Sequence, residues 1–221
     1  MLNMRSADDL TATARIRDAA VDLFGREGFG VSVRAIAAAA GVSPGLVIHH
    51  FGSKDKLHRA CDEYVAESIR ASKSESIASS DPATWMAQMA EIEQYAPIMR
   101  YLVRSIRSGG DLAKTLWRTM IDGVEEYVAE GVRAGTVKPS ADPAARARFL
   151  AFANCGSFLL YLQLHPDPSD LRSVLRDYSE DMVLPALEVY SHGLMTDSTM
   201  YDAFLAQRQK GVALSEGDSD D

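Results

Sequence analysis

Long apolar runs, paired cysteines and a net positive charge are all missing from this sequence of 221 residues. The longest apolar run, Phe149 to Leu164, contains polar residues and falls short of the about 20 apolar residues that a membrane span needs, so it predicts a buried helix. Acidic residues near the start replace the apolar core of a signal peptide. Cys61 and Cys155 lie far apart and form no CxxC motif, which suits a reducing compartment. We therefore expect a cytoplasmic protein.

Motifs for catalysis or metal binding are also scarce. A di-iron helical bundle needs Glu-x-x-His pairs, and Glu188 and His192 are spaced one residue too far for that pattern. His49 and His50 are adjacent, so on a helix they point about 100° apart and cannot share a metal ion. A helical-bundle enzyme is the weaker alternative, and we expect no enzyme, no metal and no cofactor.

The net charge of −8 hides an uneven distribution. Residues 1–60 carry eight Lys or Arg and six Asp or Glu, whereas the rest carries fifteen basic and twenty-five acidic residues. A near-neutral to basic segment on an acidic body can still bind phosphates, because the field at the contact face decides. The composition therefore permits nucleic-acid binding by the N-terminal part.

Apolar residues recur with helical spacing along almost the whole chain, and no segment alternates with period two, so we predict an all-α fold. Ser32, Ser43 and Ser53 are expected to cap helices in the N-terminal part. Asp81 and Asp142 are expected to cap later ones, and a short last helix is expected over 201–209. The polar, Ser-rich segment 72–80 predicts a connection.

The stretch GVSPG, Gly41 to Gly45, fits the G-x-S-x-G pattern of a hydrolase nucleophile. That site needs a preceding strand, and IAAAA favours a helix instead. It also needs the N–H of the residue after the serine, and Pro44 has none. Ser43 is therefore interpreted as a helix cap.

A helix-turn-helix explains more of the same residues. Ile36 and Ala37 would pack inward, Gly41 would adopt the left-handed turn, Val42 would fill the space between the helices, and Ser43 with Pro44 would begin the second helix. The stretch SVRAIAAAAGVSPGLVIHHFGSKDKL, with DLFGREGFG before it, resembles the DNA-binding domain of the TetR family of bacterial transcriptional repressors. The resemblance covers roughly residues 14–60.

This resemblance implies that the second helix of the motif lies in the major groove of DNA. Carried over to this chain, it places Gly45, Leu46 and His49 toward the groove, and phosphates near Ser32, Arg34, Ser43, His50 and Lys54. Arg34 is equally well explained as a solvated surface charge. The chain departs from the family at Ile48, where a tyrosine is usual, so one phosphate hydrogen bond is missing.

The C-terminal half is rich in Met and aromatic residues, which can line an adaptable apolar pocket or fill an ordinary core. As ligand-binding candidates we single out Trp85, Met89, Tyr95, Trp117 and Phe152. The helices over about 143–165 and 170–192 carry broad apolar faces; they either pack within one chain or, as in TetR-like proteins, pair with a second copy in a four-helix bundle. The stretches 89–117, 130–143 and 181–194 resemble an actinobacterial subgroup that represses drug-efflux genes, the regulators of antimicrobial-assisted survival.

Together these features predict three parts: a helix-turn-helix DNA-binding domain over 1–72, a ligand-binding and dimerisation domain over 73–209, and a disordered acidic tail over 210–221. The resemblance implies a homodimeric repressor that binds a near-palindromic double-stranded operator and is released by a small apolar or amphipathic ligand. An activator, and an architectural or ligand-independent DNA-binding protein, stay open as alternatives.

Overall fold

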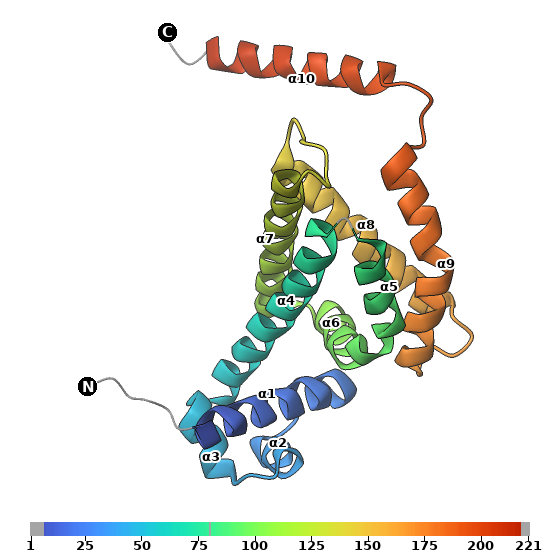
Figure 1. Cartoon of the computed structure of the whole chain (residues 1–221). Coiled ribbons are helices and arrows are strands. Elements are labelled where there is room, and N and C mark those ends of the chain that lie inside the picture. The colour runs from blue at the N-terminus through green and yellow to red at the C-terminus, as the bar shows by residue number, and fades with distance from the viewer. Residues whose placement is uncertain (1–6, 80, 218–221) are drawn as a thin grey trace. The chain divides into compact units, whose positions relative to one another are not determined.

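The computed structural model describes residues 7–79 and 81–217, with side chains described over 11–79 and 81–208, and these residues form helices and connections without a strand (Figure 1). The all-α prediction is therefore confirmed. The chain divides into two compact units, Met1–Ser179 and Glu180–Asp221. The predicted boundary at residue 72 lies within a single helix, Lys54–Ala78, and stays a prediction.

The first unit begins with α1 (Ala7–Glu27), α2 (Val33–Ala40), α3 (Pro44–Phe51) and α4 (Lys54–Ala78). Each of the last three starts at a predicted serine cap: Ser32 Oγ accepts from Ala35 N, Ser43 Oγ from Leu46 N and Ser53 Oγ from Lys56 N, at 3.1–3.2 Å. Between α2 and α3, Gly41 adopts the left-handed conformation with φ 66° and ψ 37°. These local signals fix the helix-turn-helix as predicted.

The helices of the predicted regulatory domain follow as α5 (Pro82–Ala90), the 3-10 helix η1 (Ile92–Tyr95), α6 (Ala96–Ser108), α7 (Gly110–Ala134) and α8 (Pro143–Leu164). Helix α9 (Leu171–His192) begins in the first unit and ends in the second. The side chains of Asp81 and Asp142 accept from backbone N–H groups at the starts of α5 and α8, as expected.

The predicted connection over 72–80 is wrong for most of its length, because α4 continues to Ala78. Ser76 Oγ donates back to Ser72 O at 3.0 Å, which satisfies the hydroxyl within the helix. Side chains from α5 and η1 hold the same polar turn: Trp85 Nε1 donates to Ser76 O at 2.8 Å, and Tyr95 Oη donates to Ser72 Oγ at 2.9 Å. These tertiary bonds explain why the Ser-rich segment stays helical.

Three clusters of buried apolar residues hold the first unit together. The largest cluster joins α1, α2, α3 and α4 to α6 and α7. It contains the fully buried side chains of Phe24, Ile36, Leu57 and Tyr101. A second cluster joins α6 and α8 to the start of α9, and a third joins α7 to α8. Helix α6 therefore contacts both the helix-turn-helix and the regulatory helices.

Within this chain, helix α8 is buried on one face only, so the expectation of a buried helix is met for that face alone. Phe158 and Leu162 are 5% exposed, whereas Phe149 and Phe152 are 65% and 64% exposed. Among the described residues, no helix is long and apolar enough to cross a membrane.

The second unit consists of the end of α9 and of α10 (Thr199–Gly217). The sequence predicts a helix over 201–209 and a disordered tail from 210; the helix instead extends to Gly217. VALSE after Gly211 is compatible with a helix, which explains the longer element. The remaining tail residues, 218–221, lie outside the described part of the chain.

Candidate DNA interface and regulatory domain

Helix α3 has one buried face and one exposed face. Val47 is 1% exposed and anchors α3 in the core of the helix-turn-helix. Ser43, Gly45 and His49 are exposed, and Leu46 is half-buried. These four predicted contacts therefore lie on a helix whose outer side is free to enter a groove.

Two predicted phosphate contacts lie at helix N-termini. Ser32 and Ser43 are exposed caps of α2 and α3, where backbone N–H groups point outward and the helix dipole favours an anion. Arg34 is exposed in the first turn of α2, and Lys54 is half-buried at the start of α4. The geometry suits a phosphate backbone that passes these ends.

His50 differs from the other predicted DNA contacts because it faces α1. Its Nδ1 lies 3.2 Å from Thr13 Oγ1, and its Nε2 is buried without a hydrogen-bond partner among the described residues. A ring held in this way does not present a nitrogen to the solvent. The placement favours a role in seating α3 against α1 over the predicted phosphate contact.

Ile48 occupies the family's usual tyrosine position and is 44% exposed. An aliphatic side chain there has no hydrogen-bond donor. The exposure shows that the position is open to solvent in this chain, so the missing tyrosine removes a donor from the surface of α3 and disturbs no core contact.

A clamp between α6 and the DNA-binding helices has no signal in the sequence. The Arg104 guanidinium donates two hydrogen bonds to the C-terminal end of α1: Nε to Gly25 O at 3.3 Å and Nη2 to Arg26 O at 3.0 Å. Tyr101 donates to Asp62 Oδ1 on α4 at 2.6 Å. Such pairs join residues far apart in sequence, so only the tertiary structure can show them.

The clamp also perturbs the groups in it. Burial raises the pKa of Asp62 to about 6, although the Tyr101 hydrogen bond opposes this shift. Burial also raises the pKa of Tyr101, and its hydrogen bond to Asp62 adds to the shift. The phenol therefore stays protonated and donates to Asp62 throughout the neutral range.

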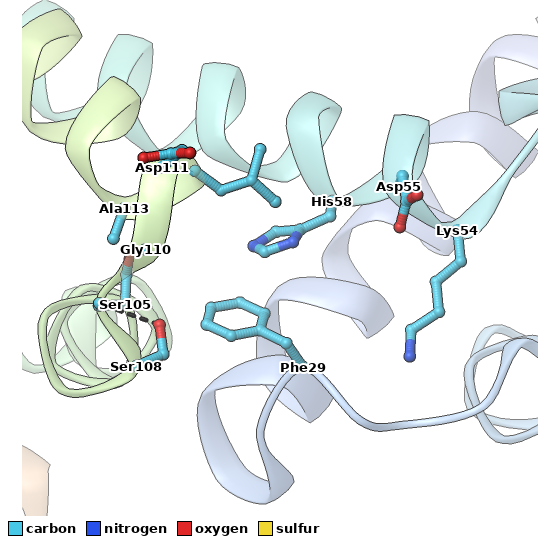
Figure 2. Close-up of a pocket in the computed structure, with 11 residues that line it drawn as sticks. Phe29, Lys54, Asp55, His58, Ser105, Ser108, Gly110, Asp111 and Ala113 are labelled. Atoms are coloured by element: carbon cyan, nitrogen blue, oxygen red, sulfur yellow. Dashed lines mark hydrogen bonds between the residues drawn. The ribbon is translucent and has the colours of Figure 1, made fainter.

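A cavity of about 320 Å³ lies where the helix-turn-helix meets α6 and α7 (Figure 2). Phe29 and Asp55 line one part, and Ser105, Gly110 and Asp111 line the other. The rings of Phe29 and His58 stack with centroids 4.1 Å apart, and burial lowers the pKa of His58. The cavity marks a junction of mixed polar and apolar lining between the helix-turn-helix and the start of α7.

The five ligand-binding candidates are spread over the regulatory helices. Trp85 and Tyr95 are both hydrogen-bonded to α4, and Met89 Sδ accepts from Ser179 at 3.2 Å. Trp117 is half-buried on α7, whereas Phe152 is 64% exposed on α8. None of the five lines the junction cavity or a second, acidic cavity of about 520 Å³ along α7. The structure brings Trp85 and Tyr95 together against α4 and leaves Phe152 apart.

Comparison with known proteins agrees with this architecture. Residues 16–61 match the model of bacterial regulatory proteins of the tetR family, and residues 93–196 match the tetracyclin repressor-like C-terminal domain. The HTH-type transcriptional regulatory protein RaaS of Mycobacterium tuberculosis (strain ATCC 25618 / H37Rv) is 68% identical over 210 residues, which cover 95% of this chain and 99% of the relative.

Two solved structures share the fold at lower identity. SmeT, the repressor of the Stenotrophomonas maltophilia multidrug efflux pump SmeDEF, has a TM-score of 0.51 at 22% identity, covering 79% of this chain and 89% of SmeT. A transcriptional regulator from Aquifex aeolicus VF5 has a TM-score of 0.51 at 16% identity, covering 76% and 98%. With its helix-turn-helix, its regulatory helices and its 68% identical relative, the chain belongs to the TetR family of bacterial transcription regulators and is not an enzyme.

Proposed function

We propose that this regulator is a homodimeric repressor that reads a near-palindromic operator with α3. The observation that carries the proposal is the exposed outer face of α3, flanked by the capped N-termini of α2 and α3. His49 and Leu46 read base edges, the latter through a thymine methyl group. Ser32, Ser43, Arg34 and Lys54 hold phosphates and set the register.

The dimer is supported by the exposed stripe of α8. Phe149, Phe152, Leu160 and Leu164 are 62–75% exposed and lie on one side of the helix, opposite the buried Phe158 and Leu162. A stripe of large apolar side chains in water marks a protein interface. A two-fold dimer presents two copies of α3, which a near-palindromic operator requires.

The ligand is a small apolar or amphipathic molecule bound among the regulatory helices, with Trp85, Met89 and Tyr95 as the first candidates. It weakens operator binding only if it has different affinities for the DNA-bound and DNA-free conformations. Helix α6 can transmit such a change to the DNA-binding helices. It packs against α8 and the start of α9, and its Arg104 is hydrogen-bonded to the end of α1. The resemblance of the C-terminal stretches further supports drug-efflux genes as the regulated genes.

The DNA-binding proposal is tested with the purified protein and DNA from upstream of its own gene, against scrambled DNA, in a salt series. Lys54→Ala should weaken binding to both DNAs and reduce the slope of log affinity against log salt by about 1, because it loses a phosphate contact. His49→Ala should weaken only selective binding, by about 1–3 kcal/mol.

Arg133→Ala is the matched control, because it removes the same charge from an exposed position on α7. Equal effects of Arg133→Ala and Lys54→Ala would show that only net charge acts. Binding without selectivity, lost with salt, would favour an architectural protein instead. Among ligands that bind, one that leaves operator affinity unchanged at saturation would contradict the inducer role.

A further inference from the structure

Helix α10 lies beyond the region that matches the family's C-terminal domain, since that match ends at residue 196 and α10 begins at Thr199. Its first turns carry three large apolar side chains, Met200, Tyr201 and Phe204, which are 58%, 60% and 66% exposed. Met200 and Phe204 are four residues apart, so they lie on one face with Tyr201 beside them. Ala206 is exposed on the opposite face of the helix.

A helix that leaves such a face in water gains little from folding. Most helical stability in proteins comes from packing of an apolar face, and helices without such packing are marginal in water. Large apolar side chains that are exposed next to one another mark an interaction surface. The α10 face, defined as Met200, Tyr201 and Phe204, is therefore expected to be covered by another surface.

The exposed apolar residues of α10 continue those of α9 along the chain. Leu184, Leu187 and Tyr190 form a stripe on α9 and are 75%, 39% and 55% exposed. Leu194 and Met195, in the connection to α10, are 83% and 68% exposed. The family resemblance implies that α9 pairs with a second copy as α8 does. The occupant that covers the α9 stripe is then placed to cover the adjoining segment as well.

We propose that the α10 face docks on a second copy of this chain and extends the dimer interface beyond α8 and α9. The inference rests on the proposed dimer. In a two-fold dimer each α10 contact occurs twice, so a change in α10 acts twice on the dissociation constant. The helix thus makes this regulator a tighter dimer than the matched family domain alone would form.

The test compares dimer dissociation of the full chain and its variants by analytical ultracentrifugation over a dilution series. The triple variant Met200→Gln, Tyr201→Gln, Phe204→Gln removes the apolar face. Glutamine is a good helix former, so the variant should keep the helix. We expect its dimer dissociation constant to rise by about tenfold or more. The control Ala206→Gln changes an exposed position on the opposite face and should leave the constant within about twofold of the unmodified chain.

A triple variant that dissociates like the unmodified chain would overturn the role of α10 while the dimer itself stands. An unmodified chain that is monomeric at every concentration would overturn both the dimer and this inference. Circular dichroism checks that the variants are folded. If the triple variant is not, Phe204→Gln is compared with Ala206→Gln by the same measurement. A weaker dimer only in Phe204→Gln supports the inference, and equal constants overturn it.

Discussion

Gly41 sets the direction of the chain between the two helices of the DNA-binding motif. Its φ of 66° lies in the left-handed region, and its N–H donates to Ala38 O at 3.2 Å. A Cβ added there would meet no atom within 4 Å. Any cost of a side chain at this position is therefore a backbone cost and not a clash.

Gly41→Ala should lower the free energy of unfolding by about 1 kcal/mol, since left-handed backbone costs an L-residue about 1–2 kcal/mol and the stiffer unfolded chain returns part of that. Urea unfolding at one fixed protomer concentration measures it. Gly45→Ala is the control, because Gly45 is not among the positive-φ glycines and alanine favours its helix. Equal losses in both variants would contradict this explanation.

Asp62 gives the clamp a defined pH dependence. Its pKa in the folded protein is about 6, above the ordinary value of 3.8, because the carboxyl is buried. Its stabilising contribution is therefore complete below about pH 4 and is lost as the pH rises through about 6. Asp62→Asn keeps an acceptor for Tyr101 without the charge, so the variant should be about 1–3 kcal/mol more stable than the unmodified protein at pH 7.5.

The difference between Asp62→Asn and the unmodified protein should shrink toward zero as the pH falls from 7 to 4. Urea unfolding at several pH values follows it. His58, whose lowered pKa acts in the opposite direction, lies with Nε2 3.8 Å from Asp62 Oδ1. The same comparison in a His58→Gln background therefore isolates Asp62. A difference that is constant with pH would show that the carboxyl is not the titrating group.

Among the elements, α6 packs both with the helix-turn-helix and with α8 and the start of α9. Arg104→Met keeps an unbranched apolar stem and removes both hydrogen bonds to the end of α1. It should lower the free energy of unfolding by about 1–2 kcal/mol, because partly exposed charge-assisted bonds are lost. Thermal unfolding measures this against Arg107→Met, an exposed arginine of the same helix. Equal melting temperatures for the two variants would remove the clamp from the account.

The starts of most helices can be predicted from sequence because their signals are local. Ser32, Ser43, Ser53, Asp81 and Asp142 all cap as expected, since the cap and its N–H partner lie within a few residues. The continuation of α4 cannot be predicted in this way, because it depends on bonds from Trp85 and Tyr95 to a polar turn. Local propensity fails where tertiary contacts decide.

The same distinction applies to the candidate site. The exposed positions of α3 follow from helical periodicity once Val47 is assigned to the core. The inward turn of His50 depends on Thr13 of another helix, and the position of Tyr101 in the core depends on Asp62. Residues that act on the outside of one helix are thus predictable, and residues that join two helices are not.

For the whole molecule, the central claim is a two-fold dimer whose two α3 helices enter successive major grooves. Hydroxyl-radical footprinting on DNA upstream of the chain's own gene tests this most directly. We predict two protected half-sites related by a near-palindrome, with centres about one helical turn or a multiple of it apart. A single unpaired half-site, or uniform protection without sequence preference, would contradict the account.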